Sequence, residues 1–170
     1  ADSKGGVVRV LVKDMLTSIP LSGVVAELLQ FEDHDRDLAR ISSATSGEDG
    51  VAILRDIKEG FYCLRLSRDG YASRLLTQFE NSSREITVFD PMPLCLSAQL
   101  AGRVVDEKGA PLANAKIAAG LALSPDGKRY VQNFFVEPGA RGQPNAKSDA
   151  DGRFILTGLP HGKVSLWVGR

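Results

Sequence analysis

Several residue types are scarce in this chain of 170 residues, and each scarcity argues against a class of protein. Two cysteines do not make a disulfide framework. Two histidines leave little material for a nucleophilic triad or a histidine-rich metal centre. Lys plus Arg and Asp plus Glu both number 21, so the chain has no basic surplus to suggest a nucleic-acid partner. No apolar run approaches the roughly 20 residues that a membrane helix needs, so we expect no transmembrane segment.

An internal repeat is the main feature that is present. The segment SGEDGVAILRDIKEGFYCLRL (Ser46–Leu66) aligns without a gap with SDADGRFILTGLPHGKVSLWV (Ser148–Val168), 102 positions later. Upstream, IPLSGVVAEL (Ile19–Leu28) matches APLANAKIAA (Ala110–Ala119) at a shorter offset. Strands that keep their register while a loop changes length are typical of duplicated β-domains.

Each copy has the pattern of short strands separated by turns. Val8, Val10 and Val12 occupy alternate positions, as in a half-buried strand. Glycine with positive φ, proline and aspartate predict turns between the strands. The predicted turn residues are Gly50, Gly60, Gly109, Pro111, Asp151, Gly152, Pro160 and Gly162. With no long helical period, these features predict an all-β protein of sandwich type.

We expect two domains, residues 1–92 and 93–170. The boundary is predicted near VFDPMPLCLS (Val88–Ser97), a short apolar linker interrupted by two prolines. Each copy also carries one long insertion, FEDHDRDLARISSAT (Phe31–Thr45) in the first and residues 124–147 in the second.

The second copy looks shorter than the first. After Leu66 the first copy continues through SRDGYASRLLTQFE to a predicted strand at Ile86–Phe89, whereas Val168 is followed only by Gly169 and Arg170. We therefore expect the second domain to lack its closing strand. Because proteins avoid bare sheet edges, either further chain or a partner strand should fill this edge.

The second copy resembles the carboxypeptidase regulatory-like domain, which has a transthyretin-like (prealbumin-like) seven-stranded antiparallel β-sandwich. The matching positions are Gly102, Val104, Asp106, Gly109, Pro111, Leu112, Asp151, Gly152, Phe154, Leu159, Pro160 and Gly162. The first copy keeps fewer of them and has Ile57-Lys58-Glu59 where the family has Leu-Pro. The resemblance implies two tandem sandwiches that act as non-catalytic supports or binding surfaces, without a cofactor, in secreted or cell-envelope proteins.

The titratable residues favour structural roles over chemistry. His161 lies where the first copy has Glu59, so a solvent-facing turn is expected. His34 lies among acids in EDHDRD, which fits a solvated loop better than a metal site. Asp149 and Asp151 resemble the start of a calcium loop, but the further ligands of such a loop are missing, so a turn is the better interpretation.

Cys63 and Cys95 have the strand parity opposite to that of Leu64 and Leu94, so we expect both thiols to point away from the core. The sequence leaves open whether they form a disulfide.

The second insertion provides the candidate binding surface, in which aromatic residues lie among basic ones: Lys128, Arg129, Tyr130, Phe134, Phe135 and Arg141. Such residues could stack on a sugar ring or anchor a protein partner. Equally, the two phenylalanines could cover the end of their own sandwich.

The sequence thus predicts a non-enzymatic extracytoplasmic module, a rigid support or docking unit in a larger envelope or secreted assembly. A carbohydrate-binding accessory module that uses the aromatic loop is the alternative. The sequence does not identify the ligand, the partner or the oligomeric state.

Overall fold

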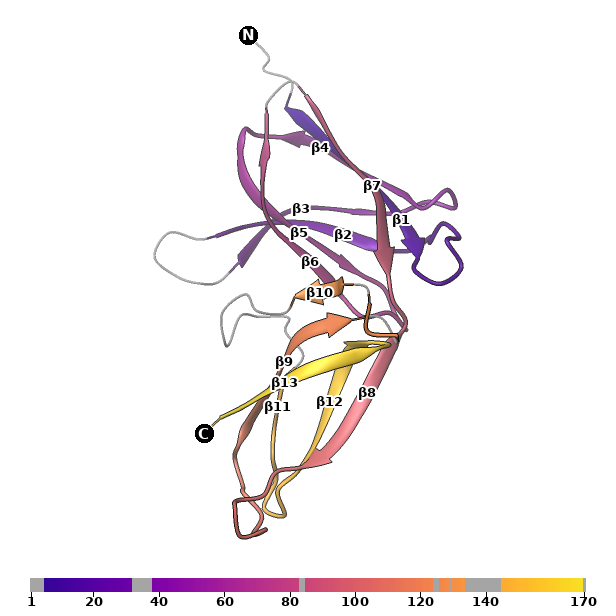
Figure 1. The fold of residues 1–170 in the computed structure, drawn as a ribbon. Helices are drawn as coiled ribbons and strands as arrows, with labels where there is room; N and C mark the ends of the chain where they lie inside the picture. The colour runs from indigo at the N-terminus through magenta and orange to yellow at the C-terminus, as the bar shows by residue number, and fades with distance from the viewer. Residues whose placement is uncertain are drawn as a thin grey trace. The chain divides into compact units, whose positions relative to one another are not determined.

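A computed structural model describes residues 5–31, 38–82, 85–123, 126–128, 130–133 and 145–169, with backbone only for residues 31, 77 and 130–133. Every regular element in these ranges is a β-strand (Figure 1). The chain divides into two compact units, Ala1–Cys95 and Leu96–Arg170. An all-β architecture with several sheets is therefore confirmed.

The first unit contains two sheets. Its strands are β1 (Gly6–Asp14), β2 (Val25–Phe31), β3 (Leu38–Thr45), β4 (Val51–Ile57), β5 (Gly60–Ser67), β6 (Arg74–Asn81) and β7 (Ile86–Leu94). One sheet has the order β4-β1-β7 and the other β3-β2-β5-β6. The pairs β1–β4, β2–β3, β2–β5 and β5–β6 are antiparallel, whereas β7 runs parallel to β1.

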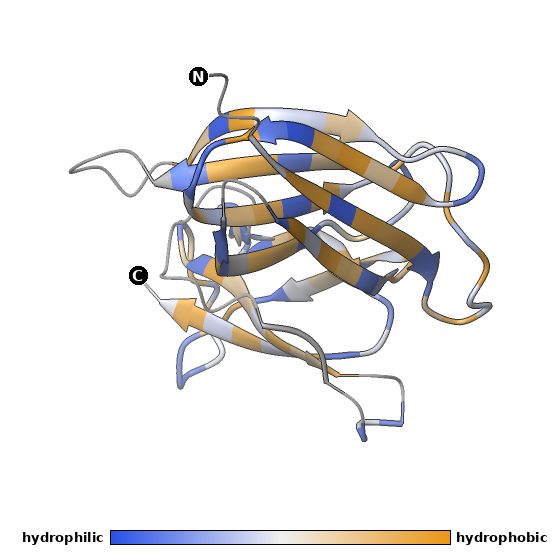
Figure 2. Ribbon diagram, turned by 90° about the horizontal axis from the view of Figure 1, so that it is seen from above, coloured by the Kyte–Doolittle hydropathy of each residue, from blue (hydrophilic) through white to orange (hydrophobic). Residues whose placement is uncertain are grey.

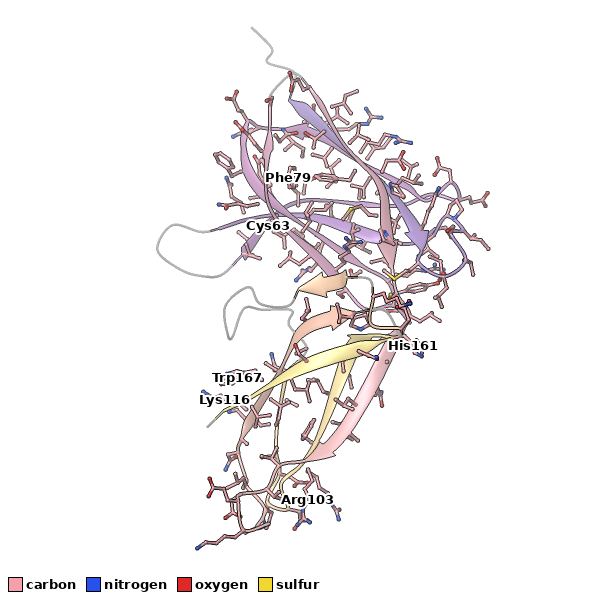
Figure 3. All side chains as sticks on the ribbon, in the orientation of Figure 1. Cys63, Phe79, Arg103, Lys116, His161 and Trp167 are labelled. Atoms are coloured by element: carbon pink, nitrogen blue, oxygen red, sulfur yellow. The ribbon has the colours of Figure 1, made fainter. Side chains whose placement is uncertain are left out.

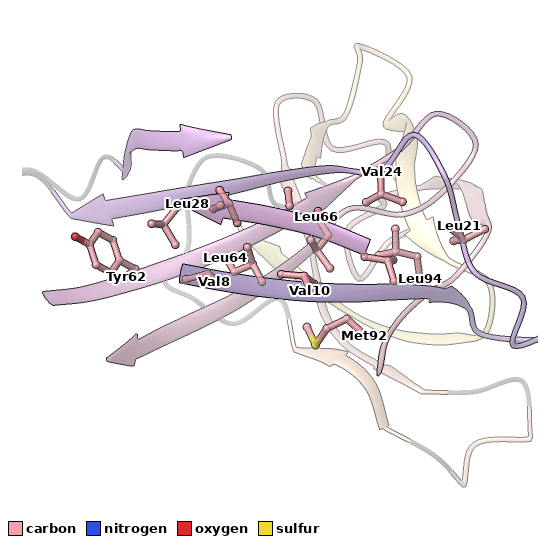
Figure 4. Close-up of a cluster of buried hydrophobic side chains, with 14 of the residues drawn as sticks. Val8, Val10, Leu21, Val24, Leu28, Tyr62, Leu64, Leu66, Met92 and Leu94 are labelled. Carbon is pink, nitrogen blue, oxygen red and sulfur yellow. The ribbon is translucent and has the colours of Figure 1, made fainter. Parts of the chain in front are cut away.

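The core of the first unit lies between these sheets. Val8, Val10 and Val12 are fully buried on β1, as the alternation predicted, and Leu64 and Leu66 are fully buried on β5. Figure 4 shows Val8, Val10, Leu64 and Leu66 among the buried side chains of this core, and Figure 2 shows apolar and polar residues alternating along the strands. Burying each such side chain contributes roughly 1.5–3 kcal/mol to stability.

The described part of the second unit also forms two sheets. Its strands are β8 (Ser97–Arg103), β9 (Lys116–Leu123), β10 (Tyr130–Asn133), β11 (Asn145–Lys147), β12 (Arg153–Pro160) and β13 (Lys163–Gly169). In one sheet β8 pairs with β12 alone, and in the other β9 lies between β13 on one side and β10 and β11 on the other.

A buried serine makes the same hydrogen bonds in both units. Ser46 Oγ accepts the N–H of Val24 (2.9 Å) and donates to the carbonyl of Leu21 (2.6 Å). Ser148, 102 positions later, binds the corresponding N–H and carbonyl at 2.9 and 2.6 Å. The repeat seen in the sequence is thus a repeat of hydrogen-bonded geometry.

A glycine beside each serine turn also repeats. Gly50 and Gly152 have φ of 76° and 75°, a conformation that glycine adopts without strain. A Cβ on Gly50 would lie 2.6 Å from the carbonyl oxygen of Val12, and one on Gly152 would lie 2.3 Å from that of Val104. Only glycine lets these turns approach the first strand of each unit so closely.

The division between the two units, at Cys95 and Leu96, falls inside the predicted segment Val88–Ser97, but most of that segment is strand and not linker. Residues as far as Leu94 belong to β7, which pairs with β1. Pro91 and Pro93 are tolerated because β7 is an edge strand, where a missing N–H breaks no ladder.

The two segments interpreted as insertions also contain strands. Residues 38–45 form β3, and residues 130–133 and 145–147 form β10 and β11. Their alternation is weak because they lie at or near sheet edges. The side chains of β3, for example, are all exposed or half-buried.

Candidate functional site: the open edges of the second unit

The candidate aromatic surface is described only in part. Lys128 is exposed, and its N–H donates to Asp126 Oδ1 (3.0 Å). Tyr130 is the first residue of β10, with only its backbone described. Arg129, Phe134, Phe135 and Arg141 lie outside the described residues. The carbohydrate-binding alternative therefore stays a prediction.

The predicted turn residues lie at or beside connections between strands. Gly109 has φ of 81°, and Pro111 bridges to Val105. Gly60 begins β5. Pro160 differs from its expected place inside a turn, because it is the last residue of β12 and pairs with Ser97. That connection is therefore made by His161 and Gly162 alone.

The acidic turn before β12 uses its carboxylate for backbone hydrogen bonds. Asp149 Oδ1 accepts the N–H groups of Asp151 (2.9 Å) and Arg153 (2.8 Å). In the first unit Asp49 Oδ1 similarly accepts the N–H of Val51 (3.0 Å). A local turn accounts for the acids at both places.

Only one of the two histidines, His161, lies among the described residues. His161 is exposed, as expected, and its N–H donates to the carbonyl of Leu96 (3.1 Å). Figure 3 labels it in the turn before β13. His34 lies outside the described residues. Within the described ranges, no cluster of three or more His, Cys, Asp or Glu residues could hold a metal.

The expectation for the two cysteines is wrong in one respect: both thiols are buried, and both are free. Cys63 does have the parity opposite to Leu64, but it pairs with Leu29, which is also buried on that face. Alternation predicts the face of a strand and not whether that face is open to water. Cys95 follows the end of β7, so strand parity does not apply to it.

Cys95 lies in a sulfur contact at the end of the first unit. Its Sγ lies 2.9 Å from Met15 Sδ. Burial, followed by the negative charge of Asp14, raises the pKa of the Cys95 thiol, and the charge of Arg74 opposes this shift. A raised pKa keeps the thiol protonated and unreactive near neutral pH.

Asp14 anchors the turn that follows β1. Its Oδ1 accepts the N–H groups of Leu16 (2.9 Å) and Thr17 (2.8 Å), and its Oδ2 accepts the hydroxyl of Tyr71 (2.9 Å). The Thr17 bond is the main reason why the pKa of Asp14 is lowered, burial opposes it, and the Tyr71 bond adds to it. Burial and the hydrogen bond to Asp14 raise the pKa of Tyr71, so this pair serves to hold structure.

The second unit differs most from the first at two sheet edges. In the first unit, β7 pairs with the outer side of β1, and β6 pairs with the outer side of β5. In the described part of the second unit, no strand pairs with the corresponding sides of β8 and β13. The sequence predicts one unfilled edge, whereas the described residues leave two edges unpaired.

Apolar residues line these open edges on the side that faces the core. Leu166 and Val168 on β13 lie opposite the buried Ala119 and Ile117 on β9. Directly opposite residues share a sheet face, so both residues belong to the core side. Yet Leu166 is 38% exposed and Val168 is 49% exposed.

The same holds at the edge of β8. Leu100 lies opposite the fully buried Leu156 but is 37% exposed, while its counterpart Val8 has no exposure. The repeat predicts Leu100, Leu166 and Val168 as strand residues, but none of them was predicted as part of a binding surface. The sequence signal that could have identified them is the alignment with Val8, Leu64 and Leu66, which occupy core-facing positions in the first copy.

The comparisons with known proteins give distant structural similarity only. No family model and no curated protein matches the chain, so the carboxypeptidase regulatory-like resemblance stays a prediction. The Bacillus anthracis TIE protein is similar at TM-score 0.42 and 19% identity over 97% of this chain. The Streptococcal ancillary pilin is similar at TM-score 0.42 and 16% identity over 99% of this chain. The minor pilin GBS52 of Streptococcus agalactiae is similar at TM-score 0.41 and 15% identity over 95% of this chain.

The chain spans 28% of the length of the TIE protein, 54% of the ancillary pilin and 82% of the minor pilin. The described residues contain no helix long and apolar enough to cross a membrane.

Proposed function

We propose that this chain is a non-catalytic structural and docking module that joins a larger extracytoplasmic assembly through the open edges of its second unit. The two units would be tandem sandwiches of the transthyretin-like type. In the first, β7 and β6 pair with β1 and β5, and in the described part of the second the matching edges of β8 and β13 are unpaired. The extracytoplasmic location follows from the resemblance of the second copy to the carboxypeptidase regulatory-like domain.

One contrast carries the docking proposal. Leu64 and Leu66 are fully buried in the first unit, whereas their counterparts Leu166 and Val168 are 38% and 49% exposed. A single exposed leucine is ordinary on a protein surface. Core-side residues exposed beside unpaired backbone, at both sheets of one unit, form a surface that favours strand addition.

The test is capture of partners from an envelope extract of the native organism, with the wild type and a Leu166→Lys, Val168→Lys variant. Ile155→Lys is the matched control, because Ile155 is 63% exposed on β12, away from both open edges. We expect the wild type and the control to capture a protein that the edge variant loses. That protein should slow amide exchange in β8 or β13. Capture that does not depend on the edge, or leaves exchange there unchanged, would contradict the proposal.

A further inference from the structure

We propose that the outer face of strands β9, β11 and β13 binds an acidic polysaccharide, with one sugar ring stacked on Trp167 and carboxylates held by Lys116 and Lys147. This inference goes beyond the proposed docking function and does not rest on it. The docking edge presents Leu166 and Val168 on the core side of β13, whereas Trp167 lies on the other side of the same strand.

Two rows of directly opposite residues cross this face. Residues directly opposite one another share a sheet face. Ile117 of β9 is fully buried, so its neighbours Lys116 and Ala118 face outward. The members of the two rows are Lys147, Lys116 and Gly169 in the first and Asn145, Ala118 and Trp167 in the second.

The indole ring of Trp167 lies across the backbone of Gly169. A Cβ on Gly169 would lie 2.5 Å from Cζ2 and 2.9 Å from Cζ3 of that ring, so only glycine leaves room for it. Because Gly169 lies opposite Lys116, the ring also lies beside Lys116, as Figure 3 shows. The Trp167 side chain is still 42% exposed. One side of the ring therefore lies on the sheet, and the other side is accessible to a ligand.

The lysines give this face a positive charge that the fold does not require. Lys116 and Lys147 are exposed and directly opposite each other, an arrangement that destabilises a sheet through repulsion. Strands β9, β11 and β13 contain no Asp or Glu that could offset these charges. The whole chain, by contrast, has equal numbers of acidic and basic residues. An anionic ligand would relieve the repulsion.

The equivalent face of the first unit has a different composition. Arg65, 102 positions before Trp167, lies opposite Glu27 and forms an ion pair with it at 2.7 Å. In the row equivalent to that of the lysines, Val25 lies opposite Thr45. The repeat therefore folds without an exposed tryptophan or a pair of lysines at these positions. Their presence in the second unit favours a binding role over a structural one.

A tryptophan beside two lysines suits a sugar ring that carries negative charge. The C–H face of a sugar ring is apolar and packs on an indole ring, while the hydroxyl groups of the sugar stay in water. The lysine ammonium group is a compact point charge, which suits a single carboxylate. Neighbouring strands are about 4.8 Å apart, so Lys116 and Lys147 lie one and two strand spacings from Gly169. This arrangement suits successive rings of a polysaccharide, each with its own carboxylate.

The test is a titration of the full chain with hexagalacturonate, in which every ring carries a carboxylate. Trp167 is the one tryptophan of the chain, so its fluorescence reports directly on a stacked ring. We expect a saturable change in emission that weakens as the salt concentration rises. The fully methyl-esterified hexasaccharide has the same rings without the charge and should give no such change. A hyaluronan hexasaccharide, which contains glucuronate, is the second acidic probe.

Variants measured by calorimetry separate the ring from the charges. Trp167→Ala should weaken binding roughly tenfold, and Lys116→Gln or Lys147→Gln about threefold each. Lys108→Gln is the matched control, because Lys108 is an exposed lysine in the turn after β8, away from this face. It should bind as the wild type does. The double variant Ala118→Glu, Trp167→Arg reproduces the ion pair of the first unit, so it should fold and lose binding.

Three results would overturn the inference. The first is that neither acidic hexasaccharide binds the wild type. The second is that the methyl ester binds as tightly as hexagalacturonate. The third is that Tyr130→Ala abolishes binding while Trp167→Ala leaves it unchanged, which would assign the sugar to the aromatic loop instead. None of these results bears on the docking proposal, which is tested by capture that depends on Leu166 and Val168.

Discussion

The two units share their connections and differ in their closure. The serine that ties the turn to the strands, and the glycine that brings this turn against the first strand, occur at the same places in both. Yet Val8, Leu64 and Leu66 have no exposure, while their counterparts Leu100, Leu166 and Val168 are 37–49% exposed. The geometry of these turns is therefore set by residues nearby in the sequence. Closing the core requires two further strands, which the described part of the second unit does not contain.

The largest expected effect comes from truncating equivalent core-facing leucines, Leu64 in the first unit and Leu166 in the second. Leu64→Ala should lower the free energy of unfolding of the first unit by about 2–5 kcal/mol, because it opens a cavity in a closed core. Leu166→Ala should cost the second unit only about 1 kcal/mol, because its side chain is already partly in water. Amide exchange resolved by residue measures each unit separately. Equal losses would mean that the second core is closed in solution.

A change at the shared serine should affect both units alike. Ser46→Ala and Ser148→Ala each leave a buried backbone N–H and carbonyl without the hydroxyl, at a cost of roughly 1–3 kcal/mol. Denaturant unfolding of the two variants, followed by exchange in β2 and β9, compares them. A loss confined to one unit would contradict the equivalence of the two turns.

The smallest expected effect concerns Tyr71, which lies in the part of the first unit that leads to the closing strands. Tyr71→Phe removes the hydrogen bond to Asp14 and should cost about 1 kcal/mol at neutral pH. The folded-state pKa of Asp14 is lowered from 3.8, so its stabilising contribution is present above that value and is lost as the pH falls through the folded pKa. In the variant this loss should be smaller, and an NMR titration of Asp14 should show its pKa moving back up. An unchanged pKa of Asp14 in the variant would contradict a contribution of the Tyr71 hydrogen bond.

Much of this organisation could be predicted because glycine, proline and alternating residues act locally. The alignment of Gly50 with Gly152 placed both turns, and the alternation of Val8, Val10 and Val12 placed β1 and its buried face. The edge strand β3 and the second part of β7, after Phe89, are not predicted, because edge strands tolerate prolines and half-exposed residues and their patterns then resemble those of loops.

The sequence pattern also does not predict burial that depends on packing between several strands. Cys63 was placed on the correct face, but the burial of that face depends on packing that parity does not reveal. The open edges of β8 and β13 were anticipated only as one missing strand. The pairing of β7 with β1, which shows that the edge of β8 is also unpaired in the described residues, is a long-range parallel contact with no local signature.

Amide hydrogen exchange of the unmodified chain measures directly whether β8 and β13 have unpaired edges. Among the described residues, β9 has a partner on both sides in the second unit, as β1 and β5 have in the first, whereas β8 and β13 have a partner on one side. We predict slow exchange in β1, β5 and β9, and fast exchange at the amides of β8 and β13 that face away from their only partners. Protection in β8 and β13 equal to that in β1 and β5 would contradict the account.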